Sequence, residues 1–152
     1  MFGFLRRTSL SQQERVALQD YLRTSRQQMD VLQKEFQDWL QGAGDSNGQL
    51  HLQGDPTGQN ASVYLWRVAG AARDFVEHEP PKIAGKYHEA FRLCLEARGA
   101  AADTFREAAD RAAIADPAAK IKEANMRLEQ AQDELENARE AIADIERKLA
   151  SA

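Results

Sequence analysis

The residues best suited to metal chemistry gather around one proline pair, Pro80-Pro81. The cluster consists of Glu77, His78, Glu79, His88 and Glu89. Histidine and carboxylate groups are common metal ligands, so the cluster is a candidate metal site. Helical bundles that hold two iron ions place a Glu three residues before a His, and no histidine here has such a Glu. We therefore expect no metal and no other cofactor, with His78 and the glutamates forming a solvated helix end.

Two residues, His88 and Cys94, could in principle take part in catalysis. His88 follows the core position Tyr87 and is expected to be a structural histidine, because no partner for a general base is identifiable. Cys94 lies on a core row, where a cysteine usually behaves as a small hydrophobic residue. No phosphate-binding loop and no nucleophile-elbow motif occurs in the sequence. These features favour a protein that is not an enzyme.

The first ten residues form a short apolar and basic tail. An apolar tip with basic neighbours can contact an anionic membrane surface. We expect residues 1–10 to fold onto the end of the molecule or to be disordered, and peripheral membrane association is the alternative. The residues that would contact a membrane are Phe2, Phe4, Leu5, Arg6 and Arg7.

Composition limits the class of protein. A chain of 152 residues with 43% hydrophobic and 29% charged residues is typical of one globular domain, here residues 1–152. The net charge of −4 argues against nucleic-acid binding. The N-terminal charges follow the apolar residues, which is the reverse of a secretory signal, and one cysteine suits a reducing compartment. We expect a cytoplasmic protein.

Apolar residues recur at alternating intervals of four and three in four segments, which predicts four helices at about 11–41, 58–79, 81–114 and 117–150. Ser11 and Glu14 have the capping-box spacing that begins a helix. Gly42 is the expected end of the first helix, and Asp116-Pro117 the expected start of the last.

These segments predict an all-α protein, a four-helix, mostly antiparallel bundle with long coiled-coil-like helices. Residues 42–60 are rich in Gly, Asp, Asn and Pro and predict a long loop. Leu50 and Leu52 alternate with polar residues in this loop and favour a short extended piece that pins it to the bundle.

The last segment carries the most regular apolar stripe. Its residues are Ile121, Ala124, Leu128, Ala131, Leu135, Ala138, Ile142, Ile145 and Leu149. Small residues let two helix backbones approach closely, and such a stripe suits a pair within the chain or between chains. Our main hypothesis is a non-catalytic helical interaction or scaffold protein that self-associates, or binds another helical protein, through this stripe.

Two alternatives stay open. The first is a bundle that binds a small molecule or a metal, near His88, Tyr87 and Trp66 or under the 42–60 loop. The second is peripheral membrane association through the N-terminal tail. The sequence indicates no nucleic-acid partner.

Overall fold

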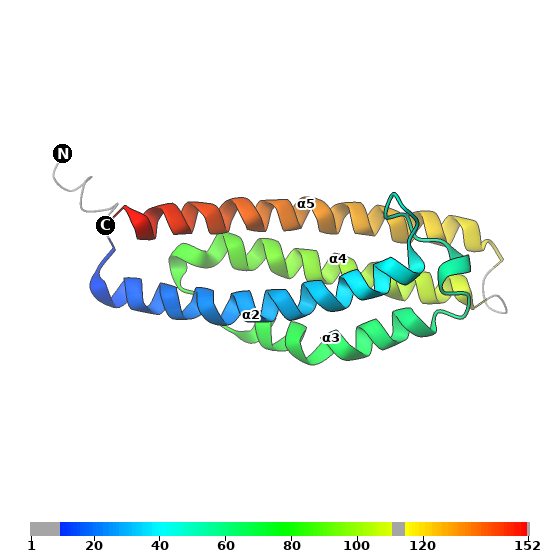
Figure 1. Ribbon diagram of the computed structural model, residues 1–152, viewed down its shortest axis with the longest axis horizontal. Coiled ribbons are helices and arrows are strands. Elements are labelled where there is room, and N and C mark those ends of the chain that lie inside the picture. Colours follow the sequence, from blue (N-terminus) through cyan, green and yellow to red (C-terminus); the bar gives the residue numbers. More distant parts are fainter. Residues whose placement is uncertain (1–9, 111–114, 152) are drawn as a thin grey trace.

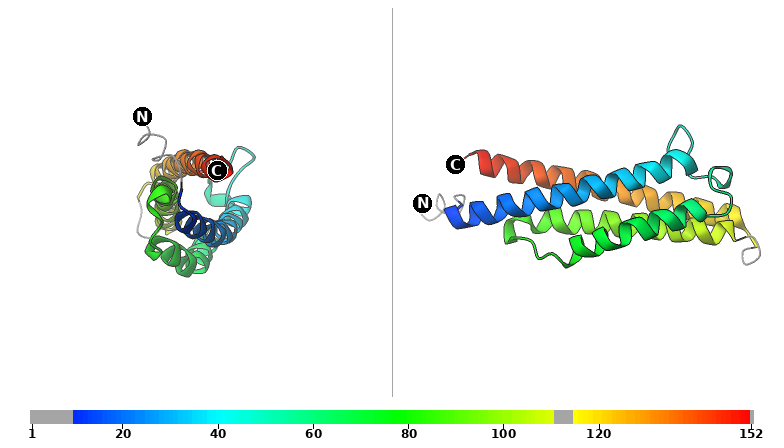
Figure 2. Two further views of the ribbon diagram at one scale, coloured as in Figure 1. Left: turned by 90° about the vertical axis from the view of Figure 1, so that its left-hand side faces the viewer. Right: turned by 60° about the horizontal axis from the view of Figure 1, so that its bottom comes forward.

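The chain folds into four helices, which a computed structural model describes for residues 10–110 and 115–151. The helices are α2 (Gln12–Ala43), α3 (Gln59–Glu77), α4 (Gly85–Ala109) and α5 (Pro117–Ala150). Successive helices run in opposite directions (Figure 1), and the end-on view shows them around a common core (Figure 2). Within the described ranges the chain forms no strand. The prediction of an all-α, mostly antiparallel four-helix bundle is confirmed.

Two of the predicted helix starts have the capping groups that their sequences indicate. The Ser11 hydroxyl accepts a hydrogen bond from the Glu14 backbone N–H at 3.1 Å, and the Ser11 N–H donates to the Glu14 carboxylate at 3.2 Å. Asp116 accepts from the Ala119 N–H at 3.3 Å, with Pro117 in the first turn of α5. Each cap satisfies backbone donors that have no partner inside the helix.

The end of the first helix differs from the prediction. Gly42 does not end the first helix: α2 continues to Ala43 and stops at Gly44, whose backbone is extended. The returning loop explains this, because a Cβ atom on Gly54 would lie 2.4 Å from the Gly42 carbonyl oxygen, so the loop packs directly on the last turn.

The third predicted helix, in contrast, is shorter than expected. It begins with a 3-10 turn, η2 (Lys82–Ala84), and continues as α4. It ends at Ala109, before the predicted residue 114. The Asp110 N–H donates to the carbonyls of Arg106 and Glu107, and the backbone of Asp110 itself is no longer helical. Residues 111–114 lie outside the described part of the chain.

The stripe of α5 faces the inside of the same chain. Ala124, Ala131, Leu135, Ala138 and Ile145 are buried. The other four stripe residues are half-buried and pack against the same core. The stripe is therefore covered by the chain's own helices, chiefly by α4, which lies beside α5 in Figure 1. The aromatic part of the core lies between α2, α3 and α4, where Trp39 stacks on Tyr64 at 5.3 Å between ring centroids.

The loop between α2 and α3 is tied to the bundle by hydrogen bonds between side chains and the backbone. Gly44 and Leu50 form an isolated antiparallel bridge, so the expected extended piece is reduced to one bridge, and Leu52 belongs to the 3-10 turn η1 (Leu52–Gly54). The side chain of Asn125 on α5 accepts from the Leu50 N–H at 2.7 Å and donates to the Leu50 carbonyl at 3.2 Å. Buried Asp55 accepts from the backbone N–H groups of Asn60 and Ala61 in the first turn of α3. The loop thus has a fixed position over α5.

None of the helices in the described ranges combines the length and the apolar character that a bilayer-spanning segment needs.

Candidate functional site

The histidines and glutamates around Pro80-Pro81 do not assemble a metal site. Glu77, His78 and Glu79 are exposed at the end of α3, whereas His88 is buried on α4. Among the residues that the structure describes, no group of three or more His, Cys, Asp or Glu side chains lies close enough to hold a metal ion. The five residues are therefore brought near one end of the bundle without converging on a common point.

His88 is held by the core on two sides. Its Nδ1 atom lies 2.7 Å from the Tyr21 hydroxyl of α2, and its ring stacks on Phe75 of α3 at 4.5 Å between centroids and 11° between planes. Burial lowers the pKa of His88 below its ordinary value. We assign the neutral imidazole with Nδ1 as the acceptor of the Tyr21 hydroxyl. The arrangement joins three helices, as a structural histidine does.

Cys94 lies fully buried on α4 and forms no disulfide. Burial raises the pKa of its thiol, so the uncharged form is favoured. A buried neutral thiol packs as a small apolar group. The tail residues Phe2, Phe4, Leu5, Arg6 and Arg7 lie outside the described residues, so membrane contact through them stays a prediction.

One buried side chain is charged and unpaired. Arg98 of α4 is only 2% exposed, and its Nε and Nη1 atoms have no hydrogen-bond partner among the described residues. Its guanidinium carbon lies 4.0 Å above the centre of the Phe36 ring of α2. Burial is the main influence on Arg98 and lowers its pKa, but an arginine remains protonated in a protein. The bundle therefore holds a full positive charge beside an aromatic face.

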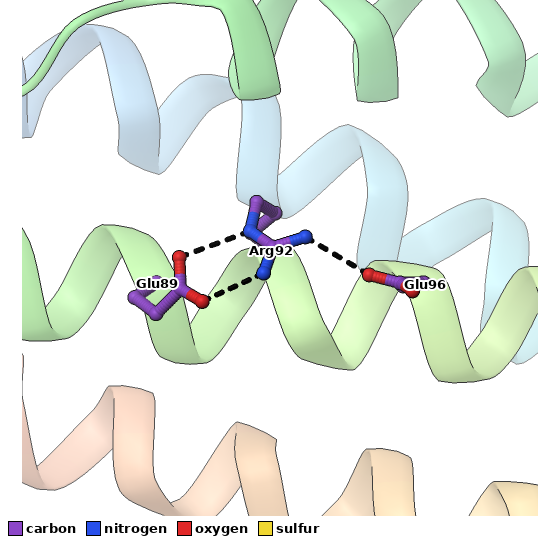
Figure 3. Close-up of polar contacts among 3 residues, drawn as sticks. All are labelled: Glu89, Arg92 and Glu96. Carbon is purple, nitrogen blue, oxygen red and sulfur yellow. Dashed lines mark hydrogen bonds and ion pairs between the residues drawn. The ribbon is translucent and has the colours of Figure 1, made fainter.

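Arg92, on the same helix, is an arginine whose donors are paired with carboxylates. Its Nε and Nη2 atoms donate to both carboxylate oxygens of Glu89, at 3.0 and 2.6 Å, and its Nη1 atom donates to Glu96 at 2.9 Å (Figure 3). This paired guanidinium lies at the surface, where water also screens its charge. Arg98, six residues later, is buried and lacks such carboxylates.

The contact with Phe36 does not compensate for the burial of Arg98. Transfer of a charged group into a protein interior costs several kcal/mol per ion even after relaxation. A desolvated cation–π contact returns about 2 kcal/mol. The remaining cost is uncompensated by any described protein group, and a buried polar group left in this way calls for an explanation.

Arg98 lines a cavity of about 240 Å³ between α2, α4, α5 and the loop after α2. Phe36, Leu40 and Leu128 give one part of its wall an apolar character. Loop residues 47–49 also line the cavity. They belong to the 42–60 loop, under which one of the two possible ligand sites is predicted. The second possible ligand site, near His88, Tyr87 and Trp66, does not form. Trp66 points to the outside of α3, whereas Tyr87 and His88 are buried.

Trp66 is the second unusual side chain. It is 79% exposed on α3, whereas the other eight Phe, Tyr and Trp side chains in the described ranges are buried. A Cβ atom on Gly70, one turn later, would meet nothing within 4 Å. Residues four apart lie side by side on a helix, so the large indole has an open, side-chain-free position beside it.

Neither Arg98 nor the outward direction of Trp66 is among the predicted features, although the sequence contains a signal for each. Cys94, Arg98 and Ala101 follow the four–three spacing of a core row, which places a charge in the core register. Trp66 lies out of phase with Val68 and Phe75, the inner residues of α3. No family model matches the chain, and no curated protein or solved structure matches it either.

Proposed function

We propose that this chain is a non-catalytic helical interaction protein that associates with a second copy of itself through the outer face of α3. The observation that carries the proposal is the exposure of Trp66. Tryptophan is enriched among the residues that contribute most to protein association, and its burial removes a large apolar area from water. Self-association is also the main hypothesis from the sequence, but the contact surface proposed here is on α3 and not on the α5 stripe.

The burial of the α5 stripe supports this change of surface. Its nine residues already pack inside the chain, so a partner helix would have to displace α4 or α2 to reach them. Trp66 needs no such rearrangement, because its indole is already on the surface. An interface that forms without unfolding the monomer avoids that cost.

The local shape of α3 suits a symmetric pair. In an antiparallel pair of α3 helices related by a two-fold axis, Trp66 of each copy lies over Gly70 of the other. Such an interface uses the same patch on both copies and closes at the dimer. The open position at Gly70 provides the space that an indole needs.

The charges on α3 also permit a pair. The helix carries Arg67 and Arg73 together with Asp74 and Glu77, so its formal charge is zero although the whole chain carries −4. Two copies of α3 therefore approach without the like-charge repulsion that two acidic surfaces would meet. A buried, unpaired free cysteine suits a cytoplasmic location, which is part of the proposal.

Light scattering after size exclusion tests the proposal. One helix face buries less area than a standard interface of about 1,600 Å², so we expect a weak dimer with a Kd on the order of 10 µM. Trp66→Ser removes the contact from both copies of the symmetric pair, so it should weaken the dimer on the order of 1,000-fold, which is the effect of losing two contacts worth roughly 2 kcal/mol each.

Met126→Ser is the matched control, because Met126 is a 55% exposed apolar residue on a different helix, α5. It should leave the dimer unchanged. A monomer at all concentrations up to the high micromolar range would refute the proposal. A dimer that is equally stable in Trp66→Ser would refute the assignment to α3.

A further inference from the structure

We propose that the cavity beside Arg98 binds a small organic carboxylate. The carboxylate of the ligand would pair with the Arg98 guanidinium, and its short apolar body would lie against Phe36 and Leu40. The residues that line this cavity, under the loop that follows α2, include none from α3, so ligand binding there does not depend on self-association.

The unpaired donors of the Arg98 guanidinium favour an anionic ligand. Arg98 has donors that no described protein group accepts, in a position that is 2% exposed. A guanidinium presents a planar set of donors that matches the two oxygens of a carboxylate. Asn47, Gln49 and Gln132 line the same cavity and carry amide groups that can donate to a bound anion.

The size and charge of the surroundings select a small monoanion. The cavity volume of about 240 Å³ lies below the range of about 300–1,000 Å³ that is typical for drug-sized ligands. Glu129 also lines the cavity and forms no ion pair with Arg98 in the described structure. Its negative charge and the net charge of −4 disfavour a multiply charged anion such as phosphate.

The apolar wall favours a ligand with a hydrocarbon part. Phe36, Leu40 and Leu128 lie along the cavity and would remove a short alkyl chain from water. An inorganic anion gains nothing from this wall. The combination of one buried cation with an apolar wall therefore favours an organic carboxylate over a free inorganic ion.

The cavity is held open by bonds that do not involve a ligand. The Asp45 carboxylate accepts from the backbone N–H groups of Asn47 at 2.8 Å and Gln49 at 3.0 Å, which fixes the turn that covers the cavity. Asn125 ties the adjacent Leu50 to α5. A site whose walls are already fixed loses less entropy on binding.

Titration of the full-length ¹⁵N-labelled protein with hexanoate tests the inference, with 1-hexanol and inorganic phosphate as separate probes. We expect saturable shifts of the Gly48 and Gln49 amides with hexanoate, and at least about tenfold weaker binding of the two other probes. Arg98→Met should weaken hexanoate binding about 30-fold or more, since the charge that selects the anion is lost.

A second pair of variants leaves Arg98 in place. Gln132→Glu adds a negative charge at the cavity and should weaken hexanoate binding about threefold, whereas Gln130→Glu is the same change on the same helix away from the cavity and should have no effect. Glu129→Gln should tighten binding.

Four results would overturn the inference. They are no saturable hexanoate binding, unchanged binding in Arg98→Met, hexanol binding as tight as hexanoate binding, and phosphate binding tighter than hexanoate binding. The first excludes the site, the second excludes the role of Arg98, and the last two exclude a carboxylate with an apolar body as the ligand class.

Discussion

Replacement of Arg98 by methionine is expected to stabilise the protein in the absence of ligand. Methionine matches the unbranched part of the arginine side chain, and its sulfur would take the place of the guanidinium beside the Phe36 ring. Such a sulfur–aromatic contact is worth about 0.3–1.5 kcal/mol. The substitution loses a cation–π contact of about 2 kcal/mol. It also removes the several kcal/mol that burial of an uncompensated charge costs.

The sum of these effects is an increase of about 1–3 kcal/mol in the free energy of unfolding, because the desolvation cost is the largest of the three. For a chain of this length the increase corresponds to a rise of roughly 2–4 °C in Tm for each kcal/mol. Urea unfolding followed by circular dichroism at 222 nm measures it, in a buffer free of organic carboxylates.

Arg92→Met on the same helix is the matched control. It removes an arginine whose donors are satisfied at the surface, so it should not stabilise the protein. The reasoning would be refuted if Arg98→Met lowered the free energy of unfolding by about 3–5 kcal/mol. A loss of that size is typical of breaking a buried ion pair, and it would mean that a carboxylate such as Glu129 neutralises Arg98 in solution.

Three further predictions concern glycine packing, histidine titration and the loop. Gly54→Ala should destabilise the protein by at least about 1 kcal/mol in urea unfolding, because its Cβ would overlap the end of α2, whereas Gly99→Ala in α4 should stabilise it by about 0.5–1 kcal/mol. Burial lowers the pKa of His88 in the folded state, so the unfolded chain binds more protons below about pH 6.5 and the folded state loses stability as the pH falls through that value. His88→Asn should lose less stability than the natural chain between pH 7.5 and pH 5, and equal losses would contradict the shift. Asn125→Ala removes both side-chain bonds to the backbone of Leu50, so hydrogen exchange at the Leu50 amide should accelerate at least about tenfold, and unchanged exchange would show that the loop is held elsewhere.

The helices could be predicted because their ends are marked by residues with local effects. Ser11, Asp116 and the proline pair act within one turn of the backbone, so neighbouring residues suffice to interpret them. The end of the first helix could not be predicted from neighbouring residues alone. Gly42 remains helical because a loop that returns from residue 54 packs on it, and that contact is invisible in the local sequence.

Periodicity indicates that a face is buried and does not identify what covers it. The α5 stripe fits a partner within the chain as well as one from another chain, and the structure covers it within the chain. The same limit applies to Arg98. Its spacing from Cys94 places it in the core register, but only the tertiary structure shows that no described carboxylate meets it there.

The position of Trp66 shows that helical phase decides whether a residue can contribute to a site inside the bundle. The sequence predicts one possible ligand site near Trp66, Tyr87 and His88. The inner residues of α3, Val68 and Phe75, place Trp66 on the opposite side of that helix, and the structure leaves it exposed. Only Tyr87 and His88 are brought together, in the core.

The most direct measurement for self-association through α3 is the fluorescence of Trp66 as a function of protein concentration. Trp39→Phe removes the buried tryptophan and leaves Trp66 as the single emitter. If two copies pair through α3, its emission should shift to shorter wavelength, and quenching by acrylamide should decrease, as the concentration rises from about 1 to 100 µM around the expected Kd. An emission maximum and a quenching constant that stay those of an exposed indole across this range would contradict the account.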